Sequence, residues 1–183
     1  DDRLDVPLVQ VESDVCVPVE TASEKEEYAA RTIRPRIHKH LLDFLTPVEQ
    51  VKVRHPSTDE DIKGLDLDDI DGILGDMRLD TSVGPAPEFR GGTPEAKKRL
   101  DEFVDEKLDH FAEARNDPMA DCQSNMSPYL HFGQISPIYI ARRVIDAGSP
   151  GEDDYIEELV VRRELAINFV HNNSNYDNPD CLP

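Results

Sequence analysis

Residues 124–137 read Ser124-Asn125-Met126-Ser127-Pro128-Tyr129-Leu130-His131-Phe132-Gly133-Gln134-Ile135-Ser136-Pro137. The stretch holds two Ser-Pro pairs, and each pair is typical of a helix start, because serine caps backbone N–H groups and proline fits the first helical turn. Gln123 and Ser124 precede the first start, whose free N–H groups favour an anion. The stretch therefore predicts two helices, with either ordinary capping by Ser127 or an anion site at the first.

Helical patterns continue on both sides of this stretch. Upstream, Thr93-Pro94-Glu95 predicts a capped start. The next apolar stripe comprises Leu100, Phe103, Val104, Leu108 and Phe111, and Asn116-Asp117-Pro118 ends it. Downstream, a helix with Ile140, Ala141, Val144 and Ile145 inward stops at Gly148, and another runs from Asp153 or Asp154 to about Val170. The second half is therefore expected to be all-α.

The first half has a different character. Alternating valines in residues 6–19 predict one or two short strands, and Ser23 is a candidate helix cap. A helical stripe of Ile37, Leu41, Phe44 and Leu45 follows Pro35. Residues 48–92 indicate a connector with a short helix near Leu65–Leu74. Nine of its acids lie between positions 59 and 80, but their spacing does not match a calcium loop.

The charge balance bears on possible partners and on solvent. The chain has 183 residues, with 39 acidic and 20 basic side chains and a net charge of −19. That charge alone disfavours nucleic acid as a partner. However, Asp exceeds Glu, 23 to 16, and Arg exceeds Lys, 13 to 7. This bias favours a halophilic protein, whose self-repulsion salt would screen, over an acidic interaction surface.

Other features of the sequence bound its location and its chemistry. No apolar run is long enough to span a membrane. Three cysteines without metal spacing fit a reducing, cytoplasmic setting. We expect no metal site, and we expect His131 to pack beneath its short helix. The chain begins without Met at Asp1, which indicates a piece of a longer protein.

Two polar clusters have alternative interpretations. Glu158 and Arg162 stand four residues apart, which predicts either an ordinary ion pair on a helix or a carboxylate aimed into a cavity. Arg115 and Asn116 indicate a helix end, or a ligand-facing pair if the fold brings them beside Ser124.

Four blocks in one order carry a family resemblance. They are residues 27–35 (EYAARTIRP), 115–118 (RNDP), 124–137 as quoted above, and 157–165 (EELVVRREL). Together they resemble the class II cyclobutane pyrimidine dimer photolyases of the photolyase and cryptochrome family, and Asn175-Tyr176-Asp177 continues the likeness. The resemblance covers nearly the whole chain, although residues 48–92 match only loosely.

The resemblance implies a mainly α chain made of parts of two domains. Residues 1–47 would be the C-terminal part of an α/β, Rossmann-like antenna domain, and residues 48–92 an acidic interdomain linker. Residues 93–183 would be the N-terminal half of the all-α, FAD-binding domain. The implied activity is deoxyribodipyrimidine photo-lyase: reduced FAD, excited by light, transfers an electron to a pyrimidine dimer in UV-damaged DNA and splits it. An antenna chromophore of unknown identity and a monomer are also expected.

The resemblance also implies site residues. FAD would be bound by Phe111, Gln123, Ser124, Asn125, Met126, Ser127, Arg162 and Arg163. The flipped-out dimer would contact Arg115, Asn116 and Glu158, and Glu158 would be the catalytic carboxylate. Phe111 departs from the family pattern, which usually has a tyrosine there whose hydroxyl reaches the flavin phosphates, and Met126 replaces a more usual leucine.

The chain has no tryptophan, so the family's electron-transfer tryptophans and flavin-ring ligands would lie beyond Pro183. We therefore expect the chain alone to be inactive and not to retain FAD. The alternatives are a cryptochrome-like flavin photoreceptor and a non-enzymatic acidic interaction module.

Overall fold

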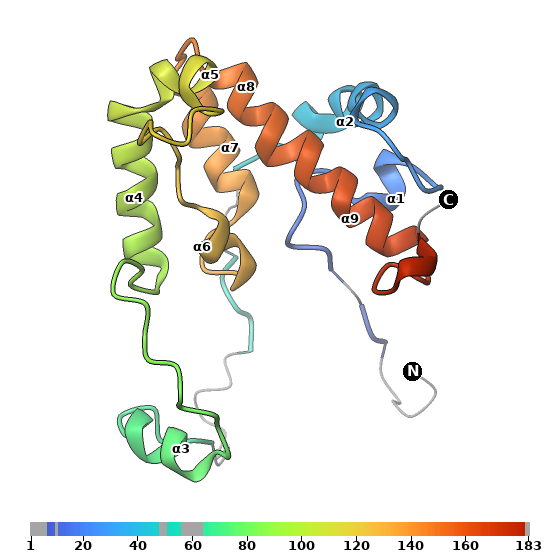
Figure 1. Ribbon diagram of the computed structural model, residues 1–183. Coiled ribbons are helices and arrows are strands. Elements are labelled where there is room, and N and C mark those ends of the chain that lie inside the picture. The colour runs from blue at the N-terminus through green and yellow to red at the C-terminus, as the bar shows by residue number, and fades with distance from the viewer. Residues whose placement is uncertain (1–6, 10, 48–50, 56–63, 182–183) are drawn as a thin grey trace. The chain divides into compact units, whose positions relative to one another are not determined.

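The computed structural model describes residues 7–9, 11–47, 51–55 and 64–181, and within these ranges it is helical and contains no strand (Figure 1). The elements follow one another as α1 (Val19–Ala22), α2 (Ala30–Phe44), α3 (Ile70–Asp76), α4 (Thr93–Glu106), the 3₁₀ turn η2 (Leu108–His110), α5 (Phe111–Ala114), α6 (Ser127–His131), α7 (Pro137–Ile145), α8 (Glu152–Ile156), the π-helical segment η3 (Glu157–Arg162), α9 (Arg163–Asn172) and the 3₁₀ turn η4 (Pro179–Cys181). The prediction of an all-α second half is confirmed.

The chain divides into two compact units. The first comprises residues 1–46 and 91–183, and the second comprises residues 47–90. The first unit holds the buried core, to which α2, α4, α7 and η3 contribute apolar side chains. In the described residues of the second unit no side chain is buried; α3 is its helix there, capped by the Asp69 carboxylate, which accepts from the Gly72 N–H at 3.0 Å.

The core of the first unit forms from the apolar stripes of its helices. The five stripe residues predicted between positions 100 and 111 are all buried. Ile140, Ala141 and Val144 of α7 are also buried, while Ile145 is partly so. Phe103, Phe111 and Tyr155 form an aromatic cluster of edge-to-face and tilted contacts, with ring centroids 4.7–5.8 Å apart. Aromatic side chains of this size contribute much of the burial energy of a small core.

Helices α8, η3 and α9 follow one another as a single long rod (Figure 1). The helix predicted from Asp153 or Asp154 to about Val170 is therefore present, beginning at Glu152 and ending at Asn172. Its middle turn is wider than an α-turn, because η3 has π-helical geometry. A π segment fits one extra residue into the rod and rotates the side chains that follow.

The strands predicted for residues 6–19 are wrong for the described part of that segment. Val15, Cys16 and Val17 are all buried, so their side chains do not alternate between a core and solvent. Among the described residues their backbone has no neighbouring strand with which to form hydrogen bonds. The N–H groups of Cys16 and Val17 instead donate to the buried carboxylate of Glu164 on α9. A single side chain therefore satisfies backbone donors that a sheet ladder would otherwise take.

Several predicted helix starts are also displaced. Ser23 ends α1 and donates its hydroxyl to Glu27, and the next helix begins only at Ala30. Thr93 does not cap α4, because its hydroxyl donates to the Gln134 carbonyl. The N-cap is Gly92, whose φ of 108° favours glycine. The short helix expected near Leu65–Leu74 is α3, which starts five residues later.

No helix in the described ranges is long and apolar enough to cross a membrane.

Candidate functional site

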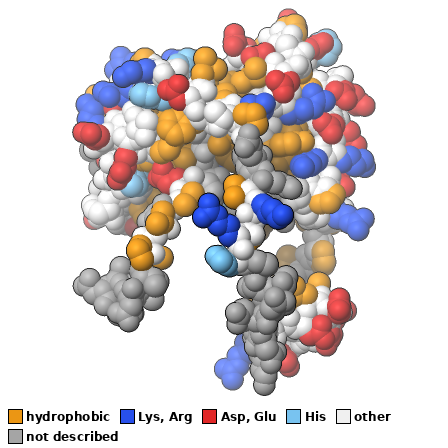
Figure 2. Space-filling view, turned by 180° about the vertical axis from the view of Figure 1, so that it is seen from behind, with side chains coloured by type: hydrophobic (Ala, Val, Ile, Leu, Met, Phe, Trp, Pro, Cys, Tyr) orange, Lys and Arg blue, Asp and Glu red, His pale blue; other side chains and the backbone are white. Residues whose placement is uncertain are grey.

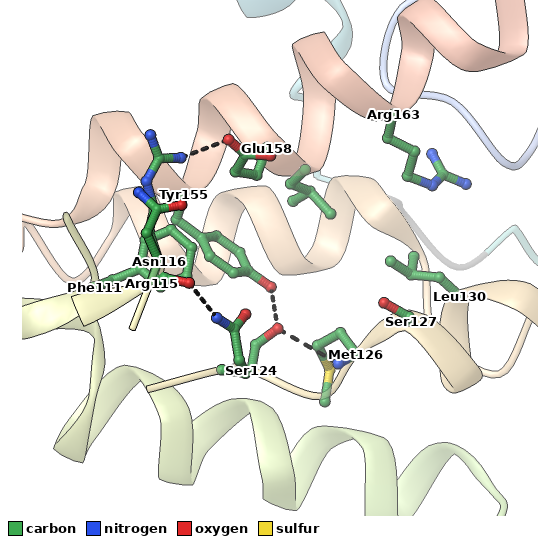
Figure 3. Close-up of a pocket in the computed structure, with 12 residues that line it drawn as sticks. Phe111, Arg115, Asn116, Ser124, Met126, Ser127, Leu130, Tyr155, Glu158 and Arg163 are labelled. Carbon is green, nitrogen blue, oxygen red and sulfur yellow. Dashed lines mark hydrogen bonds and ion pairs between the residues drawn. The ribbon is translucent and has the colours of Figure 1, made fainter. Parts of the chain in front are cut away.

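A cavity of about 420 Å³ opens in the first unit between the α5 region, the α6 start and the α8–α9 rod (Figure 3). Its volume lies within the range of about 300–1,000 Å³ that is common for small-molecule sites. The lining residues are Phe111, Arg115, Asn116, Gln123, Ser124, Met126, Ser127, Leu130, Tyr155, Glu158, Leu159 and Arg163. Polar and apolar side chains therefore line the same open cavity.

The rod supplies one wall, and the π turn decides which residues belong to it. Tyr155, Glu158, Leu159 and Arg163 line the cavity, but Arg162 does not. In a regular α-helix residue 162, seven positions after Tyr155, returns to the same face. Because η3 contains one extra residue per turn, Arg163 takes the cavity-facing position that Arg162 would have in a regular helix. Arg162 instead points to Glu157, whose carboxylate it contacts at 3.2 Å.

The Glu158–Arg162 ion pair predicted from the four-residue spacing is therefore wrong. The π geometry pairs residues five apart, so Arg162 reaches Glu157, which also accepts two hydrogen bonds from Arg34 of α2 at 2.6 and 2.8 Å. Glu158 is free of that cluster and pairs across the cavity with Arg115 at 2.5 Å. The alternative interpretation, a carboxylate at a cavity, describes its position.

Arg115 and Asn116 lie beside Ser124, the condition under which the sequence indicated a ligand-facing pair. The Gln123 side chain donates to the Arg115 carbonyl at 2.9 Å and links the two segments. The Arg115 guanidinium contacts Asp154 at 3.3 Å as well as Glu158. Its Nε atom is nevertheless buried without a hydrogen-bond partner among the described residues.

Ser124 and Tyr155 join the two walls of the cavity. The Tyr155 hydroxyl donates to Ser124 Oγ at 2.9 Å, and the Met126 N–H donates to the same oxygen at 3.4 Å (Figure 3). Burial raises the pKa of Tyr155 to about 12. The phenol is therefore neutral and keeps its proton at physiological pH.

Arg163 stands at the end of the cavity away from Arg115 (Figure 3). Its Nη1 atom is buried and has no hydrogen-bond partner within the part of the chain that the structure describes. A buried guanidinium N–H without a partner is costly unless a ligand or water accepts from it. With the Arg115 guanidinium at the other end, the cavity offers cationic donors that suit a ligand bearing phosphates and carbonyl oxygens.

Most of the site residues indicated by the resemblance gather at this cavity. Two do not line it: Arg162, as described, and Asn125, which borders a small neighbouring hollow beside α4 and adopts a positive φ of 55°. Ser127 lines the cavity but makes no capping hydrogen bond, so the prediction that it caps its own helix is wrong. His131 is exposed, and its expected packing beneath α6 is wrong as well.

Sequence reasoning missed Tyr155, Leu130 and Leu159. Tyr155 and Leu159 are spaced four residues apart around Glu158, and this spacing indicates a shared helix face but not the contact that the Tyr155 hydroxyl makes. For metals, the described residues contain no group of three His, Cys, Asp or Glu side chains placed to hold an ion.

Comparison with known proteins bears directly on this site. Along 98% of its length the chain is 48% identical to a deoxyribodipyrimidine photo-lyase of Methanothermobacter thermautotrophicus, of which it covers 39%. Nearly all of this chain is therefore similar to part of a photo-lyase. It is also 38% identical to the deoxyribodipyrimidine photo-lyase of Potorous tridactylus over 94% of its length, and 33% identical to that of Arabidopsis thaliana over 92%.

The photolyase relatives are much longer than this chain. The chain spans between about a third and two fifths of their lengths. The match nevertheless extends over nearly all of the chain, so both the N-terminal segment and the cavity lie within the part shared with photolyases. No family model matches the chain.

Proposed function

We propose that this chain is part of a class II cyclobutane pyrimidine dimer photolyase, a deoxyribodipyrimidine photo-lyase that repairs UV-damaged DNA in light. The observation that carries the proposal is the cavity itself. Residues of three blocks that resemble the class II pattern converge there from separate segments: Arg115 and Asn116, then Ser124, Met126 and Ser127, then Glu158, Leu159 and Arg163. Identity of 48% to a protein named deoxyribodipyrimidine photo-lyase supports the photo-lyase part of this proposal, and the resemblance of the sequence blocks is the basis for class II.

FAD is the cofactor that we propose for this cavity. Its residues fit such a group: Arg163 has an unpartnered buried N–H, Ser124 and Gln123 provide short polar side chains, and Phe111 and Met126 provide apolar surface. When bound in its reduced form, FAD supplies the light-driven electron. The protein's contribution is to bind and orient it and to exclude water from it.

Glu158 and Arg115 form the substrate side of the proposal. Both side chains are partly exposed, at 43% and 23%, so a flipped-out base can reach them. The Glu158 carboxylate has acceptor capacity beyond its bond to Arg115, and its position beside a guanidinium holds it in one orientation. Asn116 adds an amide that can donate or accept at the same edge. We propose Glu158 as the catalytic carboxylate.

We further propose that the chain alone does not complete the reaction. It covers 39% of the Methanothermobacter relative and contains no tryptophan. Residues 1–47 would belong to an antenna-bearing α/β domain, with an unknown chromophore, and residues 93–183 to the FAD domain. The protein would be cytoplasmic, monomeric and adapted to high salt.

The decisive experiment uses the full-length gene product that contains this chain. An oligonucleotide with one thymine dimer is incubated with the purified protein under blue light or in the dark, and the remaining dimers are counted by chromatography. We expect dimers to disappear in light only. Equal dimer content in both samples, with flavin bound, would instead support a photoreceptor. Residues 1–183 expressed alone should be colourless. A yellow preparation with stoichiometric flavin would contradict the proposal that these residues alone do not retain FAD.

A further inference from the structure

The Tyr155 hydroxyl reaches the wall of the cavity from a buried ring. The residue is 5% exposed, and its ring packs against Phe103 and Phe111 with centroids 4.7 and 5.2 Å away. These contacts fix the ring, so the hydroxyl oxygen has one position. In the described part of the chain its hydrogen-bond partner is Ser124 Oγ, at 2.9 Å.

The described residues donate two hydrogen bonds to the Ser124 hydroxyl oxygen. A serine hydroxyl offers two acceptor lone pairs and one donated proton. The Tyr155 hydroxyl donates to one lone pair, and the Met126 N–H, 3.4 Å away, donates to the other. With both lone pairs engaged, the one remaining capacity is the Ser124 proton. No acceptor for that proton lies among the described residues, and the side chain lines the cavity.

We propose that Tyr155 is a positioning residue, which holds Ser124 so that its hydroxyl proton points into the cavity and binds an acceptor oxygen of FAD. The proposal rests on the proposed function for the identity of the ligand. The chemistry requires an acceptor, such as a phosphate or carbonyl oxygen, because Ser124 has no lone pair left for a donor.

The neutral phenol keeps this arrangement over a wide pH range. Burial raises the pKa of Tyr155 to about 12, so the hydroxyl is protonated and remains the donor to Ser124. Phe111, the adjacent aromatic lining residue, has no hydroxyl and cannot take this role.

The test compares four forms of the full-length protein: wild type, Tyr155→Phe, Ser124→Ala and the double variant. FAD is titrated into each apoprotein in the dark, and the dissociation constant is measured by the quenching of flavin fluorescence. Since one net hydrogen bond alters binding by roughly five- to tenfold, Tyr155→Phe should raise the dissociation constant by about that factor. In the Ser124→Ala background the same substitution should change it less than about twofold.

Thermal unfolding of the four apoproteins separates positioning from a merely structural role. Ser124→Ala leaves the buried Tyr155 hydroxyl without an acceptor and should lower the melting temperature, and adding Tyr155→Phe should restore part of the loss. Tyr139→Phe removes a phenol from α7, where the side chain is 41% exposed and absent from the cavity lining, and serves as the matched control.

Each outcome has one meaning. Equal loss of affinity from Tyr155→Phe in both backgrounds, or unchanged affinity, would overturn the inference, as would a wild-type protein that does not bind FAD. Loss of affinity that depends on Ser124 supports it, even if the protein then fails to repair thymine dimers in light; that failure would overturn the proposed function alone.

Discussion

Gly151 precedes α8 at a point where two backbone segments almost touch. A Cβ atom added there would lie 1.8 Å from the Leu108 carbonyl oxygen and 3.3 Å from Phe111 Cβ. Because the nearest atom belongs to the backbone, no side-chain rotation relieves the clash, and η2 and α8 would have to separate. This approach brings Tyr155 against Phe111, so the glycine supports the cavity wall.

Gly151→Ala should therefore destabilise the protein by about 3 kcal/mol or more, as overpacking of a rigid core does. Gly75→Ala is the matched control, because a Cβ at position 75 of α3 would meet nothing within 4 Å. Urea unfolding followed by circular dichroism measures both. Equal midpoints for Gly151→Ala and the wild type would show that η2 and α8 can separate freely.

Glu164 is a buried carboxyl, 3% exposed, that holds the N-terminal segment on α9. Burial raises its pKa from 4.5 to about 7, although the N–H donors of Cys16 and Val17 and the charge of Arg163 act in the opposite direction. Between these two pH values the folded protein keeps a proton that the unfolded chain has lost. The free energy of unfolding should therefore fall as pH rises through this window.

Melting temperatures at about pH 5 and pH 8 test this prediction. Glu164→Gln cannot ionise, so the variant should lose less stability than the wild type between the two pH values, even if it is less stable at both. The increasing negative charge of the other carboxylates affects both proteins equally. Parallel changes in the two proteins would contradict a raised pKa at Glu164.

The single residues of the site were only partly predictable from the sequence. Ser124, Glu158 and Arg115 were candidates from the sequence because of their polar or charged side chains and the sequence blocks that contain them. Tyr155 was not, because its spacing matches that of an ordinary buried helix position, and its role depends on a hydroxyl that meets Ser124 from 31 residues away. Such a contact exists only once the rod has packed against the α6 segment.

The π segment η3 is the element that sets which arginine reaches the cavity. It moves the cavity-facing position from Arg162 to Arg163, while Glu157 holds both Arg162 and Arg34. Arg162 is 55% exposed in this cluster. The two neighbouring arginines, identical in chemistry, thus differ in surroundings.

Arg163→Ala in the full-length protein should raise the dissociation constant for FAD by about tenfold or more, because a charge-assisted donor in a buried setting is lost. Arg162→Ala should change it less than about twofold and is the matched control. Fluorescence titration of both apoproteins measures the effect. Similar losses in the two variants would mean that the rod has regular α-helical register at this turn.

The elements differ in how well the sequence specified them. The stripe from Leu100 to Phe111 has helical spacing and caused no ambiguity. Valine alternation in residues 6–19 matched a strand, but a strand needs a neighbouring strand for its backbone hydrogen bonds. Here the carboxylate of Glu164 accepts from the N–H groups of Cys16 and Val17 instead. A π turn has no comparable pattern of residues, so the sequence did not indicate that Arg163 lines the cavity in place of Arg162.

The charge of the whole molecule is the basis for a prediction about salt. A net charge of −19 on 183 residues makes the folded state repel itself, and the acidic and basic side chains are interspersed over the face seen in Figure 2. The electrostatic screening length falls from about 10 Å at 0.1 M salt to about 3 Å at 1 M salt. The melting temperature should therefore rise between these concentrations of KCl. A constant or falling value would contradict adaptation to high salt.

At the scale of the molecule, the helical class followed from the sequence. The packing of residues 19–46 into one unit with residues 91–181 did not, because it depends on contacts between distant segments. Among these are the Asn168 amide oxygen, which accepts from the Glu27 N–H at 2.7 Å, and Arg142, which donates to the Leu45 carbonyl at 2.8 Å.

The central claim, that the cavity of the first unit is the flavin site of a photolyase, is tested most directly by a crystal structure of the full-length protein with FAD. The account predicts FAD in this cavity, with one of its oxygens accepting from the Ser124 hydroxyl and another from the Arg163 guanidinium. FAD bound elsewhere in the protein, with the cavity filled by other side chains, would contradict it.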